Sequence, residues 1–134
     1  MTTTLIKKAI LLVAGLTAAA IGMAILFFPG AFYASYGIDV GSNVSLLNEL
    51  KAPGIALAAS GFFIATGAIV ARLAPLSAFV GAFLYLSFGL SRLVSMALDG
   101  LPADGLVQAA GIELLLGLAC IWVVAQQRRV AAVA

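Results

Sequence analysis

Residues 9–28 read AILLVAGLTAAAIGMAILFF, a run without one charged side chain. The hydrocarbon core of a bilayer is about 30 Å thick, and an α-helix rising about 1.5 Å per residue crosses it in about 20 residues. In lipid the backbone has no water to bond with, so such a run satisfies its own hydrogen bonds as a helix. This stretch therefore predicts a membrane-spanning helix.

Three further runs have the same character. Residues 52–71 are uncharged, residues 73–98 contain one charge, Arg92, and residues 105–127 contain one charge, Glu113. The chain is thus predicted to be all-α, a four-helix transmembrane bundle that forms a single membrane domain over residues 1–134. The expected segments are helix 1 at about 6–28, an outer interfacial segment at 29–47, helix 2 at about 48–71, helix 3 at about 75–98, an outer loop at 99–104 and helix 4 at about 105–127.

The short connections after helices 2 and 3 predict how the helices are ordered. Consecutive helices joined by a short connection pack as antiparallel neighbours, which gives an up-down-up-down bundle. Small residues also recur at spacings of three and four, and in lipid such faces let helix backbones approach closely. They are Gly15, Ala19 and Gly22 in helix 1, and Gly54, Ala58, Gly61 and Ala65 in helix 2.

The composition excludes a water-soluble domain. Hydrophobic residues make up 64% of the chain and charged residues 9%, whereas a soluble surface carries roughly 25–35% charged residues. The net charge is +2, but the basic residues stand singly or in pairs beside apolar runs. A nucleic-acid interface needs them clustered on one exposed face, so we expect the lipid bilayer, and no nucleic acid, as a partner.

Basic residues also predict the orientation. Lys7 and Lys8 precede an apolar run as in a signal peptide, but the run is too long for one, so we expect an uncleaved helix. Cytoplasmic loops carry an excess of Lys and Arg. A cytoplasmic N-terminus places five of the seven basic residues inside, and both termini are then cytoplasmic in a multi-pass protein of the cell inner (plasma) membrane. The five are Lys7, Lys8, Arg72, Arg128 and Arg129.

Arg92 and Glu113 are the charged residues within the four apolar runs. Each costs up to roughly 2.5–3.5 kcal/mol at a helix centre on insertion scales. They lie at similar depth on neighbouring antiparallel helices, so they can meet. Arg92 also belongs to one helix face that turns from aromatic to polar, and such a face lines a cavity or a partner helix. The face comprises Tyr85, Phe88, Arg92, Ser95 and Asp99.

Helix 2 adds Glu49 and Lys51 at the same outer level. With Arg92, Asp99 and Glu113 they form a predicted charged cluster, which is either a structural ion-pair network or a ligand site that opens outward. The predicted ligand-binding residues are Glu49, Lys51, Tyr85, Phe88, Arg92, Ser95, Asp99 and Glu113.

Pro53 leaves the start of helix 2 open. If the helix continues through Pro53, the Glu49 carbonyl loses its hydrogen-bond donor. If Pro53 lies in the first turn, no carbonyl is left unpaired. The aromatic residues of segment 31–36 follow helix 1 directly, which favours the headgroup region of the membrane.

Metal and cofactor chemistry lacks its usual side chains. The chain contains no histidine and one cysteine, Cys120, so haem, iron–sulfur and structural zinc sites have almost no ligands. We expect no metal and no cofactor, and the sequence does not favour an enzyme.

Four short runs carry a resemblance to a known family: Asn48-Glu49-Leu50-Lys51, Gly89-Leu90-Ser91-Arg92-Leu93-Val94-Ser95, Asp99-Gly100-Leu101-Pro102 and Glu113-Leu114. Together they resemble a bacterial family of small four-helix integral membrane proteins known as a domain of unknown function. The resemblance covers nearly the whole chain and supports the positions of the charged cluster without naming a reaction. The family usually has Asn-Glu-x-Arg at the start of helix 2. In this chain Lys51 stands in place of the Arg, which weakens any bidentate contact with an anion. The architecture is also distantly similar to DoxX-like proteins.

Three functions are compatible with these features. The first is binding of a lipid-like or polar-headed small molecule at the charged cluster. The second is a structural or accessory subunit of a larger membrane complex, with the cluster as an internal ion-pair network. The third, ranked last, is a small transporter, which would need a homodimer because four helices enclose a pathway poorly.

Overall fold

The computed structural model describes residues 2–131, and side chains for residues 3–127. Met1 and residues 132–134 of the predicted domain lie outside the described residues. The elements are α1 (Thr2–Phe27), α2 (Pro29–Ala34), α3 (Val44–Ile69), a 3₁₀ turn η1 (Ala71–Leu73), α4 (Ala74–Asp99) and α5 (Asp104–Ala131). The structure is all-helical over these residues, and four helices in this part of the chain are long and apolar enough to cross a membrane, which confirms the predicted fold class and the predicted number of such helices.

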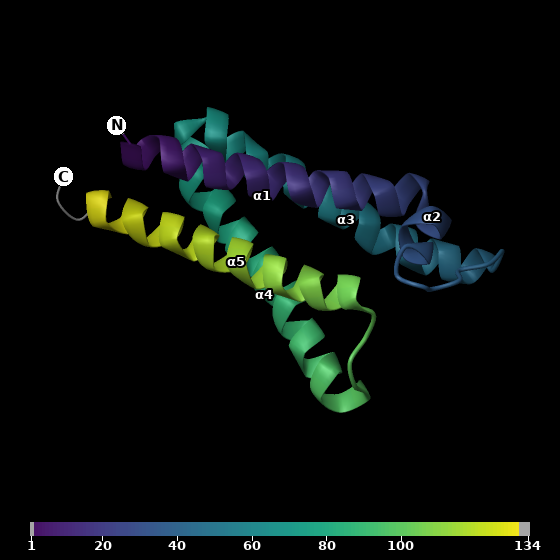
Figure 1. The fold of residues 1–134 in the computed structure, drawn as a ribbon. Helices are drawn as coiled ribbons and strands as arrows, with labels where there is room; N and C mark the ends of the chain where they lie inside the picture. Colours follow the sequence, from purple (N-terminus) through teal and green to yellow (C-terminus); the bar gives the residue numbers. More distant parts are fainter. Residues whose placement is uncertain (1, 132–134) are drawn as a thin grey trace.

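α1 packs mainly against α3 (Figure 1), through the small residues noted above. Gly15 faces Ala65, Gly61 faces Ala19, and Gly22 faces Ala58, so the two helices run in opposite directions. A Cβ on Gly61 would collide with the Ala19 backbone and lie 2.6 Å from the Gly15 carbonyl oxygen. The absence of a side chain at these positions therefore lets the two backbones touch, which maximises van der Waals contact in lipid.

α4 and α5 form the second helix pair (Figure 1). Gly89 of α4 lies against Leu114, and Gly117 of α5 lies against Leu86. Residue numbers increase along α4 as those of the contacting residues decrease along α5, so α5 runs back beside α4.

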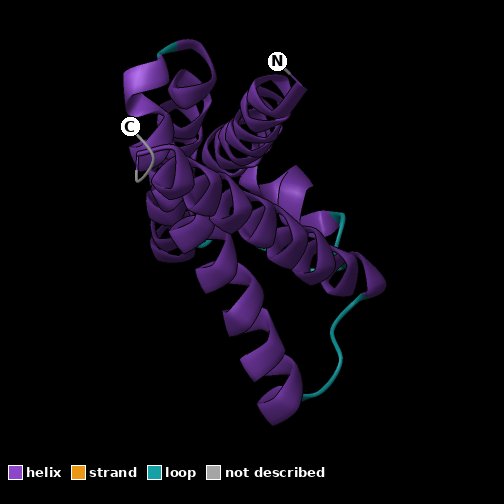
Figure 2. Ribbon diagram, turned by 90° about the vertical axis from the view of Figure 1, so that its left-hand side faces the viewer, coloured by secondary structure: helices purple, strands orange, loops and turns teal. Residues whose placement is uncertain are grey.

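The two pairs meet in a core at the end of the molecule where α1 begins and α5 ends. Leu11, Ile64, Cys120 and Val123 are fully buried there, one or more from each of α1, α3 and α5. Ser77 of α4 is also fully buried, and its Oγ donates a hydrogen bond to the Phe63 carbonyl of α3 at 3.1 Å. Toward the opposite end, α4 diverges from α1 and α3 (Figures 1 and 2).

α3 begins at Val44, four residues before the expected start of helix 2. The Asn43 side chain explains this, because its Oδ1 accepts the Leu46 N–H at 3.1 Å as an N-cap. Pro53 consequently lies inside the helix and not in its first turn. Since proline has no N–H, the Glu49 carbonyl lacks its usual helical donor. The expected interfacial segment is therefore shorter, and it contains α2.

Candidate functional site

A cavity of about 420 Å³ lies where α4 diverges from α1 and α3. All five helices contribute to its wall. Most of the wall is apolar, and the volume falls within the roughly 300–1,000 Å³ of small-molecule sites. The apolar side chains on the wall include Ile21, Ile25, Phe32, Leu57, Leu84, Phe88, Leu106 and Ile112.

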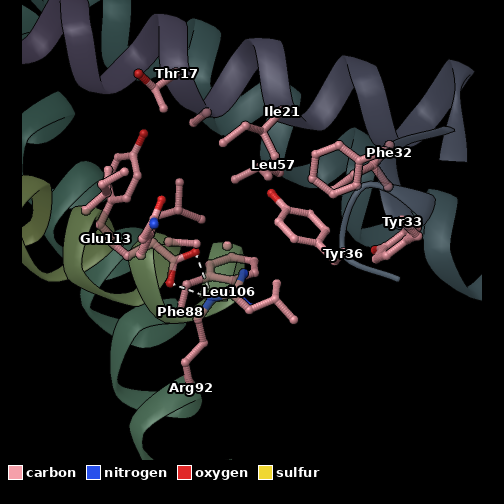
Figure 3. Close-up of a pocket in the computed structure, with 18 of the residues that line it drawn as sticks. Thr17, Ile21, Phe32, Tyr33, Tyr36, Leu57, Phe88, Arg92, Leu106 and Glu113 are labelled. Atoms are coloured by element: carbon pink, nitrogen blue, oxygen red, sulfur yellow. Dashed lines mark hydrogen bonds and ion pairs between the residues drawn. The ribbon is translucent and has the colours of Figure 1, made fainter. Parts of the chain in front are cut away.

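An ion pair between α4 and α5 interrupts this apolar wall (Figure 3). The Arg92 Nε donates to both carboxylate oxygens of Glu113, at 2.8 Å to Oε2 and 3.1 Å to Oε1. The side chains are 30% and 15% exposed, respectively. Gly89, one turn before Arg92, helps to bring them together because it lets Leu114 and the α5 backbone approach α4 closely.

This geometry leaves most of the Arg92 donors without a partner among the described residues. A guanidinium group has five N–H donors in a planar fork, and Glu113 occupies only the one on Nε. Among the described side chains, Nη1 and Nη2 of Arg92 take part in no hydrogen bond. Glu113 thus fixes the plane of the guanidinium, while four N–H donors remain for an oxygen atom in or beside the cavity.

Neutral polar groups stand on the same wall: Thr17 of α1, Tyr33 of α2, Tyr36 just after it and Gln108 of α5. In Figure 3 the Tyr36 hydroxyl points into the cavity. Burial raises the pKa of the Tyr33 hydroxyl above its ordinary value, and this outweighs the lowering by the nearby Arg92 charge. Tyr33 is therefore uncharged at neutral pH.

The α2 region closes one side of the cavity through aromatic contacts. The Phe32 ring packs edge-to-face on Tyr33 and Tyr36, with centroid distances of 5.3 and 5.5 Å. Tyr36 in turn reaches the start of α5, where a Cβ on Gly105 would lie 3.0 Å from the ring. The glycine therefore makes room for Tyr36 to span from α2 to α5.

Four of the predicted site residues line the cavity: Tyr85, Phe88, Arg92 and Glu113. Tyr85 is buried, and its hydroxyl donates to the Ala14 carbonyl of α1 at 2.5 Å. The Tyr85 hydroxyl thus serves the contact between α1 and α4, and only its ring is available to a ligand.

The structure does not bring the other four predicted residues into this cavity. Ser95 and Asp99 are exposed on the last turns of α4, where the Ser95 Oγ donates to Asp99 Oδ2 at 3.0 Å. Ser95 borders a separate pocket of about 90 Å³ that also touches Arg92. Glu49 and Lys51 are exposed on α3. Of the five members of the predicted charged cluster, only Arg92 and Glu113 form an ion pair with each other.

Most of the chain matches one known protein family. Residues 6–124 match the family described as Domain of unknown function (DUF4345). The chain belongs to the DUF4345 family. The matched range includes every residue that lines the cavity. It confirms the expected membership of a family without an assigned function, while the likeness to DoxX-like proteins stays a prediction. No curated protein and no solved structure matches the chain.

Sequence reasoning missed part of the cavity wall in this DUF4345 chain. Tyr33 and Tyr36 belong to the aromatic segment whose position after helix 1 favours the headgroup region, and the contact of Tyr36 with Gly105 of α5 depends on the tertiary fold. Gln108 gives a weak sequence signal, because it is a polar residue in the same apolar helix as Glu113 and lies five residues before it.

Tyr85→Phe is expected to lower the free energy of unfolding by about 1 kcal/mol, since one hydrogen bond between α1 and α4 is lost. The Ala14 carbonyl keeps its place in the α1 hydrogen-bond ladder, so no buried acceptor is orphaned. Chemical unfolding in detergent, followed by circular dichroism, measures the effect. A midpoint equal to that of the wild type would show that the hydroxyl contributes nothing to stability.

Proposed function

We propose that this DUF4345 chain is a bacterial inner-membrane protein that binds a lipid-like, polar-headed small molecule in the cavity beside Arg92 and Glu113. The observation that carries the proposal is the pairing of Arg92, because Glu113 engages Nε and leaves the terminal nitrogens free on a mostly apolar wall. Hydrogen bonds from a charged donor are roughly twice as strong as neutral ones. A ligand oxygen at Nη1 and Nη2 would gain such bonds.

The proposed membrane topology is an antiparallel up-down-up-down bundle with both termini in the cytoplasm. The start of α1 and the end of α5 lie at the same end of the molecule (Figure 1). Lys7, Lys8 and Arg72 also belong to that end, as the positive-inside rule favours. In this orientation the cavity lies in the outer half of the membrane, with Arg92 and Glu113 near the boundary between the head groups and the hydrocarbon region.

The apolar part of the cavity suits a hydrocarbon chain. Ile21 and Leu57 stand on the wall away from the ion pair, Phe88 lies beside the pair one turn before Arg92, and α2 covers one side of the cavity. Burial of apolar surface favours binding by roughly 25 cal/mol per Å². The ligand's chain would lie against these side chains while its head reaches Arg92.

The test is native mass spectrometry of the protein extracted gently from its own membranes. The wild-type protein is expected to carry one reproducible bound mass. Arg92→Ala is expected to lose it, because removing charge-assisted hydrogen bonds weakens affinity by about tenfold or more. Arg72→Ala is the matched control, since it removes the same side chain from an exposed position in η1, outside the cavity.

Two outcomes would contradict the proposal. If the chain is recovered without any bound small molecule, the cavity is not a ligand site under native conditions. If it is recovered attached to another polypeptide, the accessory-subunit function is favoured and the ion pair serves to hold the helices in register. Equal loss of the bound mass in Arg72→Ala and Arg92→Ala would also contradict it, because only Arg92 lies on the cavity wall.

A further inference from the structure

The two charges on the cavity wall cancel each other. Arg92 contributes one positive charge and Glu113 one negative charge, and the pair is joined through Nε. The remaining polar side chains on the described wall are neutral. Besides the Tyr85 hydroxyl, which donates to the Ala14 carbonyl, they are three hydroxyls and one amide, from Thr17, Tyr33, Tyr36 and Gln108. The site therefore offers hydrogen bonds without net charge.

From this balance, and resting on the proposed function above, we propose that the cavity selects an uncharged head group on a single hydrocarbon chain, and that Glu113 excludes anionic heads. The preferred class is a neutral ester, alcohol or amide lipid, such as a monoacylglycerol. Glu113 is then the residue that determines specificity, while Arg92 supplies the hydrogen bonds.

Electrostatics explains the exclusion of anions. An oxygen that accepts from Nη1 or Nη2 binds the same guanidinium group whose Nε already holds the Glu113 carboxylate, so an anionic oxygen there would meet a cation that Glu113 has already neutralised. The Glu113 charge then repels a second anion and offsets the attraction of Arg92 for it, and the repulsion is stronger in a largely apolar cavity than in water. An anionic head would also give the wall a net charge of −1, and an uncompensated buried charge is costly. A neutral oxygen accepts the same hydrogen bonds without either penalty.

The neutral groups fit the same ligand class. Tyrosine and threonine hydroxyls both donate and accept, and an amide does so through separate atoms. A glyceryl or amide head carries donors and acceptors that Tyr36 and Gln108 can pair, whereas a carboxylate or a fully ionised phosphate offers acceptors alone. The volume of about 420 Å³ is that of a site for one small ligand. We therefore assign one chain and not the two chains of a phospholipid.

The experiment compares two probes with the same chain, lauroyl glycerol and lauryl phosphate. Both are added to the full-length protein in phosphatidylcholine nanodiscs, and the bound masses are measured by native mass spectrometry. The wild type is expected to bind lauroyl glycerol at least about tenfold more tightly than lauryl phosphate. Glu113→Gln removes the negative charge and keeps the shape, so its preference is expected to shift toward lauryl phosphate by at least about tenfold.

Asp104→Asn is the matched control, since it removes one negative charge from the same helix at an exposed position outside the cavity. Asparagine serves at a helix start as well as aspartate does, and the control is expected to keep the wild-type preference. The comparison of the two probes on the wild type needs no variant, so it tests the inference even if Glu113→Gln assembles poorly.

The outcomes separate this inference from the proposed function. Tighter binding of lauryl phosphate by the wild type, or an unchanged preference in well-folded Glu113→Gln, would overturn the neutral-head inference and leave a ligand site in place. A shift of the same size in Asp104→Asn would also overturn it, because the effect would then come from overall charge. If neither probe binds to the wild type, while a native bound mass is still lost in Arg92→Ala, the head-group class is wrong but the ligand site stands.

Discussion

Gly61→Ala is expected to lower the free energy of unfolding by about 3 kcal/mol, the upper part of the usual range for overpacking. The added Cβ would collide with the Ala19 backbone nitrogen and lie 2.6 Å from the Gly15 carbonyl oxygen. Both neighbours are backbone atoms, which cannot turn aside as a flexible side chain can. α1 and α3 must therefore separate, and the close contact along both helices is lost.

Gly111→Ala provides the control for this change. Gly111 lies on α5, and a Cβ there would meet nothing within 4 Å. The same substitution is expected to leave stability unchanged or raise it slightly, because alanine favours the helix. Unfolding of both variants in detergent, followed by circular dichroism, measures the difference. Equal midpoints would show that close backbone contact between α1 and α3 is not a main source of stability.

Glu113→Leu is expected to lower the free energy of unfolding by about 2 kcal/mol, because it leaves the Arg92 charge unpaired between helices. Breaking a fully buried pair costs about 3–5 kcal/mol. The smaller figure allows for solvent at Arg92, whose side chain is 30% exposed. Arg92→Leu is expected to act in the same direction by leaving the Glu113 carboxylate alone.

The double variant Arg92→Leu/Glu113→Leu is expected to recover most of this loss. Replacing a buried ion pair by apolar residues is often neutral or stabilising, and it removes both charges from the membrane. The two single substitutions should therefore be non-additive by about 2 kcal/mol in a double-mutant cycle of unfolding free energies. Additive effects would mean that the pair does not couple α4 to α5.

The double variant also separates the two functions of the ion pair. If the pair serves structure alone, a well-folded double variant keeps any native bound mass. If it holds a ligand head, the double variant folds and still loses that mass, since the Nη donors of Arg92 are gone. Stability and ligand retention, measured on the same sample, therefore distinguish a register-setting pair from a binding site.

Several features of this protein follow from the sequence by itself. The number and approximate limits of the spanning helices depend on the length of each apolar run against the thickness of a bilayer. The close packing of Gly15 and Gly22 against α3 also follows from the sequence, because small residues at regular spacing form a helix face that can pack closely. The depth of a residue along a helix follows from its position in the sequence. Arg92 and Glu113 lie at similar depth on consecutive helices, so the sequence predicts that they can pair.

Other features were decided only by the tertiary structure. Glu49 and Lys51 share a level with Arg92 in the sequence pattern, but α3 packs against α1 while α4 pairs with α5, and the last turns of α4 diverge from α3 (Figure 1). The sequence sets how deep a residue lies, whereas helix rotation and lateral position come from packing of the whole bundle. The same reason explains Tyr36, whose contact with Gly105 depends on where the α2 region folds back. The wall of the cavity is thus determined by helix packing, whereas the pairing of Arg92 with Glu113 could be predicted from the sequence.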